Sequence, residues 1–110
     1  MTHQLALKFA QTMPERFEEF HADNPVVYDT LVRLAREWVA RTGRHKLGIA
    51  TLFERTRWEI ALATNDPEYK LNNNWKAYYA RLIMRREPDL DELFDLRASE
   101  ADEWIAGRAA

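Results

Sequence analysis

The chain has 110 residues and no cysteine, and its 16 basic and 18 acidic residues leave a formal net charge of −2. This length suits one domain with a single apolar core. The lack of cysteine excludes a disulfide framework and any thiolate metal site. We therefore expect residues 1–110 to form one domain that is stabilised by its core.

The first half of the chain predicts helices with clear start signals. Thr12 and Glu15 have the spacing of a capping box, which introduces a short helix ending near Asp23. Asn24 can cap a second helix through its amide, and the fixed φ of Pro25 suits the first helical position.

Gly43 is placed to end this second helix. Apolar residues recur along it at helical spacing, namely Val27, Leu31, Leu34 and Trp38.

A third helix is predicted over 49–63, and it has two apolar sides. One side carries Ile49, Leu52, Phe53, Thr56 and Ile60. At 100° per residue, Trp58 and Leu62 lie about 180° and about 220° from Ile49, so they cannot share that side. We favour packing of Trp58 and Leu62 within the same core. The alternative is that these two residues form a partner-binding surface, either for another protein or for a second copy of the chain.

Residues 64–67 indicate a turn, and a fourth helix is expected from 72 to 86, with Trp75 and Tyr79 in the core. Pro88 stops that helix. A last helix is expected from Asp89 to about Gly107, with an apolar stripe of Leu90, Leu93, Phe94, Ala101, Trp104 and Ile105. These elements predict an all-α fold, a compact orthogonal bundle of about five helices, with a divergent helix-turn-helix as one arrangement to consider.

Charge is distributed unevenly along the chain. Residues 41–86 contain ten basic and four acidic residues, whereas residues 87–110 contain two basic and eight acidic ones. Within the basic part, the helix over 72–86 begins with three asparagines and continues with cations, a composition that suits phosphates and base edges. The sequence predicts a regulatory nucleic-acid-binding protein, for DNA or RNA. The expected phosphate contacts are Lys70, Lys76, Arg81 and Arg85, and the expected base contacts are Asn73 and Asn74.

This prediction has an alternative and an internal weakness. About ten residues separate the third and fourth helices, whereas a helix-turn-helix uses three or four. The acidic tail could instead dock a cationic protein or imitate a nucleic acid, which is typical of a protein-binding module or an inhibitor of a host protein.

Catalysis is not expected from this sequence, and neither is a metal or a cofactor. The three histidines lie far apart, the one serine has no neighbouring base, and no phosphate-binding glycine loop exists.

Four segments carry a resemblance. Residues 20–28, 57–59, 70–82 and 88–97 are similar to a family of small proteins encoded in bacteriophage and prophage genomes, over the span from Phe17 to Arg97. The resemblance implies a protein of the bacterial cytoplasm that regulates or inhibits host machinery, and it carries over no catalytic residue. The N-terminus lacks the pattern of a secretory signal and no long apolar run follows, so we expect no membrane partner.

Overall fold

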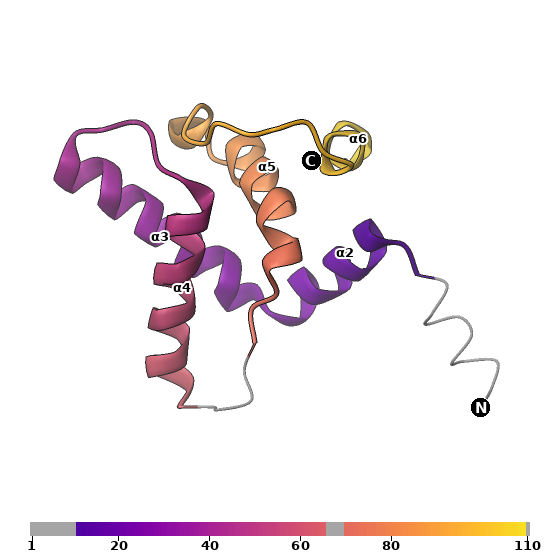
Figure 1. Ribbon diagram of the computed structural model, residues 1–110, viewed down its shortest axis with the longest axis horizontal. Helices are drawn as coiled ribbons and strands as arrows, with labels where there is room; N and C mark the ends of the chain where they lie inside the picture. Colours follow the sequence, from indigo (N-terminus) through magenta and orange to yellow (C-terminus); the bar gives the residue numbers. More distant parts are fainter. Residues whose placement is uncertain (1–10, 66–69, 110) are drawn as a thin grey trace.

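The computed structural model describes residues 11–65 and 70–109. Within these residues the chain forms five α-helices, two short 3-10 helices and no strand (Figure 1). The predicted all-α bundle is therefore confirmed. The elements are α2 (Met13–Asp23), α3 (Pro25–Thr42), α4 (Ile49–Thr64), η1 (Asn73–Trp75), α5 (Lys76–Arg86), η2 (Pro88–Leu90) and α6 (Ala101–Gly107).

The start signal of α2 works as predicted. The backbone N–H of Glu15 donates to Thr12 Oγ1 at 3.3 Å, and the N–H of Thr12 donates to Glu15 Oε1 at 3.3 Å. The role expected of Asn24 was wrong, because its side chain does not cap α3. Its Nδ2 donates back to the carbonyl of Phe20 at 2.9 Å and so satisfies the end of α2.

The ends of α3 and α4 depend on left-handed residues. Gly43 has a φ of 70° and follows α3, as predicted. Asn65 has a φ of 52° and follows α4. Asp66 and Pro67 of the predicted turn lie outside the described residues. The connection from α4 to η1 covers 65–72, which is longer than the turn of a helix-turn-helix, so that interpretation gains no support.

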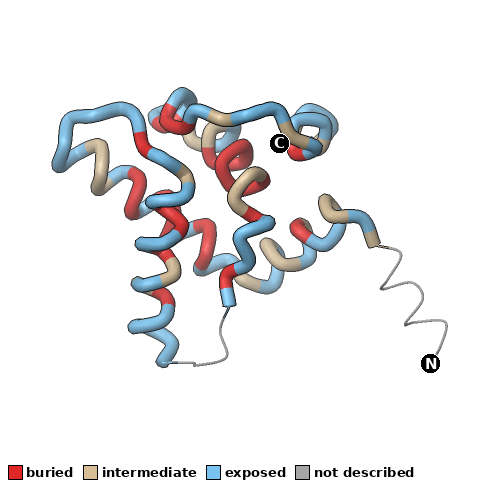
Figure 2. Tube along the Cα trace, in the orientation of Figure 1, coloured by how far each residue is buried: buried red, intermediate tan, exposed pale blue. Residues whose placement is uncertain are grey.

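Helix α5 lies at the centre of the bundle and contacts α3, α4, α6 and both 3-10 helices. Six consecutive residues of α5, 78–83, are buried, and Figure 2 shows this run of buried positions along the helix. The ring of Phe17 packs against Tyr78 and Tyr79 at centroid distances of 5.1 and 4.8 Å. Trp75 and Tyr79 therefore belong to the core, as predicted.

The expected helix from Asp89 to Gly107 was wrong. The chain makes η2, then runs without regular structure over 93–99, and forms helix again only in α6. Carbonyls of this irregular segment bond to other elements instead of to its own backbone: Leu93 O accepts from the N–H of Leu47 at 3.1 Å, and Arg97 O accepts from Arg81 Nη2 at 2.8 Å. We call residues 91–100 the strap, because it crosses from η2 to α6 over one end of α5 (Figure 1).

Ser99 lies just before α6, which begins at Ala101. Its Oγ accepts from the N–H of Ala101 at 3.0 Å, while its own N–H donates to Asp102 Oδ2 at 2.9 Å. No helix in the described ranges is both long and apolar enough to cross a bilayer.

Candidate interaction surface

The outward side of α4 is an exposed stripe. At 100° per residue, Thr51, Arg55, Trp58 and Leu62 fall within a sector of about 60°, and all four are exposed. The opposite side of α4 is buried and consists of Leu52, Phe53, Thr56 and Ile60. The favoured expectation that Trp58 and Leu62 pack in the core was therefore wrong. Their exposed fractions are 61% and 69%, the two largest among the exposed large apolar residues of the described chain.

Ion pairs border this stripe and hold its charged side chains. Arg55 pairs with Glu59 at 3.0 Å, and Glu59 also faces Arg33 at 3.6 Å. On the other border, Arg57 pairs with Glu54 and donates to the carbonyl of Leu71 at 2.7 Å. The bond to Leu71 joins α4 to the segment that precedes α5. Trp58 and Leu62 therefore lie on a helix that is bonded to its neighbours on both sides.

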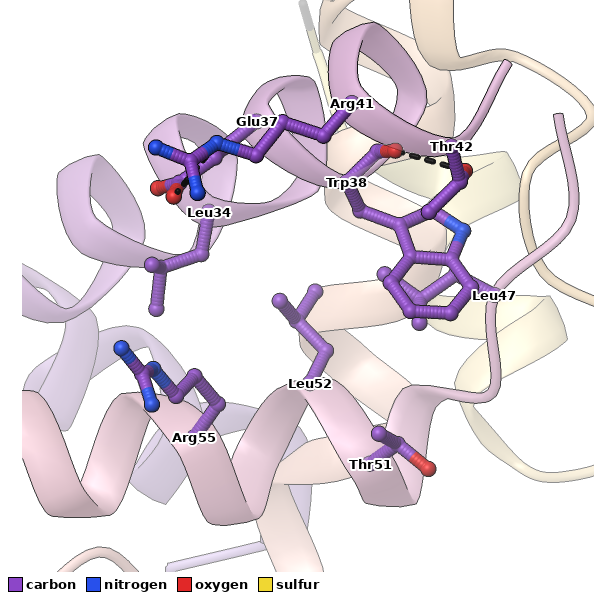
Figure 3. A pocket seen from close by; sticks show the side chains of 9 residues that line it. All are labelled: Leu34, Glu37, Trp38, Arg41, Thr42, Leu47, Thr51, Leu52 and Arg55. Atoms are coloured by element: carbon purple, nitrogen blue, oxygen red, sulfur yellow. Dashed lines mark hydrogen bonds and ion pairs between the residues drawn. The ribbon is translucent and has the colours of Figure 1, made fainter. Parts of the chain in front are cut away.

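A groove opens beside the stripe, between the C-terminal half of α3 and the N-terminal half of α4. Its volume is about 330 Å³, and its walls are mainly apolar. Figure 3 shows Leu34 and Trp38 reaching down from α3, and Leu52 reaching up from α4. We call this space the α3/α4 groove; its remaining lining residues are Glu37, Arg41, Thr42, Leu47, Thr51 and Arg55.

Sequence reasoning missed this groove. Trp38 was assigned only to the apolar side of its helix, yet its indole Nε1 donates to the carbonyl of Lys46 at 2.9 Å and stands at the groove wall. The available signal was Trp38, near the end of α3, followed a few residues later by Leu47. The sequence does not give the distance between α3 and α4, however, because that distance depends on the fold.

Arg81 does not belong to an open surface, which corrects its assignment as a phosphate contact. Its side chain is 6% exposed, and its Nε donates to Asp102 Oδ1 at 2.6 Å. Its two terminal nitrogens, Nη1 and Nη2, donate to the carbonyls of Ala77 and Arg97 at 2.9 and 2.8 Å. The bond from Arg81 holds the pKa of Asp102 below its ordinary value. Burial follows because α6 and the strap cover this side of α5.

The remaining predicted contacts do not form one face. Lys76 is the first residue of α5 and Arg85 lies nine residues later, so the two point about 180° apart. Arg85 is exposed at the far end of the helix. The other four residues stay together around the start of α5: Lys70, Asn73 and Asn74 are exposed and Lys76 is half-buried. The structure thus separates Arg81 and Arg85 from the rest of the predicted site.

The acidic tail is largely bound within the molecule. Arg36 donates to both Glu87 and Asp89, at 2.7 and 2.9 Å. Lys46 pairs with Asp95 at 3.0 Å, and Glu100 accepts from the hydroxyl of Tyr78 at 3.1 Å. Burial, followed by this bond to Glu100, raises the pKa of Tyr78 to about 12. Because these carboxylates already have partners, the tail is a poor imitation of a free nucleic-acid backbone.

His21 is half-buried beside the aromatic core. Its ring stacks on Phe17 at a centroid distance of 5.8 Å and meets Tyr28 and Tyr79 edge-on. Across the described ranges, no group of three or more histidine or carboxylate side chains is arranged to hold a metal ion.

Comparison with known proteins gives no relative: no family model, no curated protein and no solved structure matches this chain.

Proposed function

We propose that this protein is a small helical protein-binding module whose docking surface is the outward side of α4. The observation that carries the proposal is the exposure of Trp58 and Leu62, at 61% and 69%, one helical turn apart. Exposed apolar side chains on neighbouring turns favour a protein interface, and tryptophan is enriched among the residues that dominate binding energy.

The surroundings of this pair support docking in two ways. The ion pairs of Arg55 and Arg57 restrict the long side chains at its borders, which lowers the entropy that binding would cost. The α3/α4 groove starts at Thr51 and Arg55, one to two turns along the same helix, and offers an apolar recess for a partner side chain.

The identity of the partner remains a proposal that rests on the resemblance to phage-encoded proteins. That resemblance favours a bacterial protein of the host cytoplasm as the bound protein. The regulatory or inhibitory role follows from the same source.

The test compares two variants on an affinity column. The double variant Trp58→Ala, Leu62→Ser removes the apolar pair, and Val26→Ala is the matched control because Val26 is a 49% exposed apolar residue on α3. Each is immobilised and exposed to a nuclease-treated bacterial lysate. We expect the control to retain the proteins bound by the wild type and the double variant to lose them by about 30-fold or more, since losing a dominant tryptophan costs about 2 kcal/mol or more. Equal retention by both variants contradicts the proposal.

Nucleic-acid binding is the second candidate function, now restricted to the start of α5. The favouring observation is that Lys70, Asn73, Asn74 and Lys76 gather there, and that neither lysine has a carboxylate within ion-pair distance in the described residues. Amides and cations at a helix start suit phosphate and base contacts.

This candidate is tested by the salt dependence of binding to mixed DNA and RNA. Lys70→Ala with Lys76→Ala removes two phosphate contacts and should reduce the slope of log K against log salt by about 2. Arg85→Ala is the control, because it removes an exposed cation from the opposite side of α5. A slope that is the same in all three proteins, or the lack of any binding, excludes this site.

A further inference from the structure

We propose that the α4 surface docks a second copy of this chain, with the two α4 helices antiparallel and each Trp58 indole inserted in the α3/α4 groove of the other copy. This inference rests on the proposed function, because it concerns the same surface: self-pairing covers the α4 surface in the free protein, and a host protein competes with the second copy for it.

The outward stripe of α4 has the spacing of a helix-pairing seam. Thr51, Arg55, Trp58 and Leu62 follow one another at intervals of four, three and four residues, and all are exposed. This alternation keeps one side of a helix against a neighbouring helix over several turns. Within the described residues of this chain, no helix lies against that side of α4.

The projecting residue and the recess lie on the same helix. Thr51 and Arg55 line the groove in the N-terminal half of α4, whereas Trp58 and Leu62 project from its C-terminal half. Two copies with antiparallel α4 helices therefore bring each projecting indole over the other groove. A two-fold axis makes both insertions equivalent, so one set of residues forms a closed interface.

The register of this pairing is set by its residues. On antiparallel helices, each step forward along one matches a step backward along the other. Placing Trp58 over Thr51 of the second copy therefore puts Leu62 level with the connection that precedes the second α4, which begins at Ile49.

The charges on α4 do not oppose this pairing. Arg55 and Glu54 are already paired within each copy, with Glu59 and Arg57. Helix α4 contains two arginines and two glutamates, so two copies meet without net repulsion. A neutral seam of this kind matches a like neutral surface better than a strongly charged partner.

The size of the contact predicts a weak dimer. The 16 residues of α4 span about 24 Å, and only the end of α3 adds to the surface. Such an interface falls below the ~1,200 Å² of the common stable class. We therefore expect reversible association over about 1 µM to about 1 mM.

Analytical ultracentrifugation over that range is the first test. The wild type should pass from monomer to dimer, and Val26→Ala should do the same. Trp58→Ala removes the inserted indole, and Thr51→Arg fills the mouth of the groove with a long side chain; each should remain monomeric. Both substitutions are at exposed positions, and equal thermal melts by circular dichroism confirm that the fold is kept.

Mixing the two monomeric variants is the decisive test. Trp58→Ala keeps an open groove and Thr51→Arg keeps its indole, so a mixed pair retains one of the two insertions. We expect mixed dimers at concentrations where neither variant dimerises alone. A mixture that stays monomeric, or a wild-type dimer that both variants preserve, overturns the inference.

The test also separates this inference from the proposed function. A wild-type chain that is monomeric at about 1 mM overturns self-pairing. If Trp58→Ala, Leu62→Ser then still abolishes capture of another protein, the docking surface stands with a different partner. If that variant changes no association at all, both proposals fail.

Discussion

Arg81 is the residue whose placement differs most from what its neighbours in the sequence indicate. On a helical projection it lies about 60° outside the sector of Tyr78, Tyr79 and Leu82, which favours an exposed cation. In the fold it is 6% exposed, and it bonds Asp102 and two backbone carbonyls. A guanidinium can be buried in this way because its planar donors reach three acceptors at once.

Arg81→Ala should therefore lower the free energy of unfolding by about 3 kcal/mol, because the substitution leaves the Arg97 carbonyl and the Asp102 carboxylate without their donor. Arg85→Ala, four residues later and exposed, should change it by less than about 0.5 kcal/mol. Urea denaturation of both variants measures the difference. Equal, small losses would show that Arg81 is an open surface cation after all.

Thr56 offers the opposite case, a buried hydroxyl that has no hydrogen-bond partner among the described residues. The residue is 0% exposed, and no donor or acceptor of the described chain reaches its Oγ1. Thr56→Val keeps the shape and should raise the free energy of unfolding by about 1 kcal/mol, since burying an unpaired hydroxyl is costly. The same change at Thr42, whose Oγ1 donates to Trp38 O at 2.7 Å, should not stabilise the protein. Thermal melts of the two variants make the comparison.

His21 should make stability depend on pH. Burial, with a further effect from Arg108, lowers the pKa of His21 below its ordinary value of 6.5. The unfolded chain therefore binds more protons than the folded one between these two pKa values, and stability falls as pH drops through 6.5.

Replacing His21 by phenylalanine keeps a ring against Phe17 and removes the titration. The free energy of unfolding of this variant should change less between pH 7 and pH 5 than that of the wild type. Carboxylates with lowered pKa, such as Glu18 and Asp102, act in a more acidic range. An unchanged slope between pH 7 and pH 5 would exclude His21 as its source.

At the scale of elements, the predicted helix ends were correct where a particular residue satisfies a need of the backbone. The capping box of Thr12 and Glu15 and the left-handed Gly43 both act within a few residues, so the fold cannot easily override them. The predicted last helix was wrong. The apolar spacing correctly indicated that Leu93 and Phe94 are buried, but it did not determine the conformation of their backbone. The strap buries the same residues by bonding its carbonyls to Leu47 and Arg81.

Gly43→Ala should destabilise the protein by about 1 kcal/mol, because an L-residue at a φ of 70° is strained. Apart from its chain neighbours, no atom of the described residues lies within 4 Å of the added methyl group, so the loss measures backbone strain. Gly107→Ala is the matched control: its site is equally open, and the residue lies in α6 without a positive φ. Chemical denaturation should show a loss for Gly43→Ala and none for Gly107→Ala.

At the scale of the whole molecule, the acidic C-terminal part closes the bundle over α5. Trp104 of α6 packs on Phe17 and Tyr78 at centroid distances of 5.1 and 5.2 Å. Asp102 holds Arg81 from the same helix, and Arg108 bonds Glu18 of α2. Two ion pairs join the basic middle to the acidic tail, Lys46 with Asp95 and Arg81 with Asp102.

A chain that ends at residue 98 should lose several kcal/mol of stability, since Phe17, Tyr78 and Arg81 lose their cover together. We expect it to bind a dye that detects exposed apolar surface and to unfold without a sharp transition. A chain that ends at residue 108 keeps both α6 and Arg108 and serves as the control. Cooperative unfolding of the shorter chain would mean that α6 is only an accessory to the core.

The sequence by itself determined the helical class, the ends of α2 and α3 and the core positions of Trp75 and Tyr79, because caps and apolar periodicity act over a few residues. It did not determine which side of each helix is exposed to solvent. Only the tertiary structure decided that Arg81 is buried and that Trp58 and Leu62 are exposed, since each outcome depends on which distant segment packs there. The strap and α6 cover α5, whereas no described segment covers the outward side of α4, and helical spacing carries no information about either.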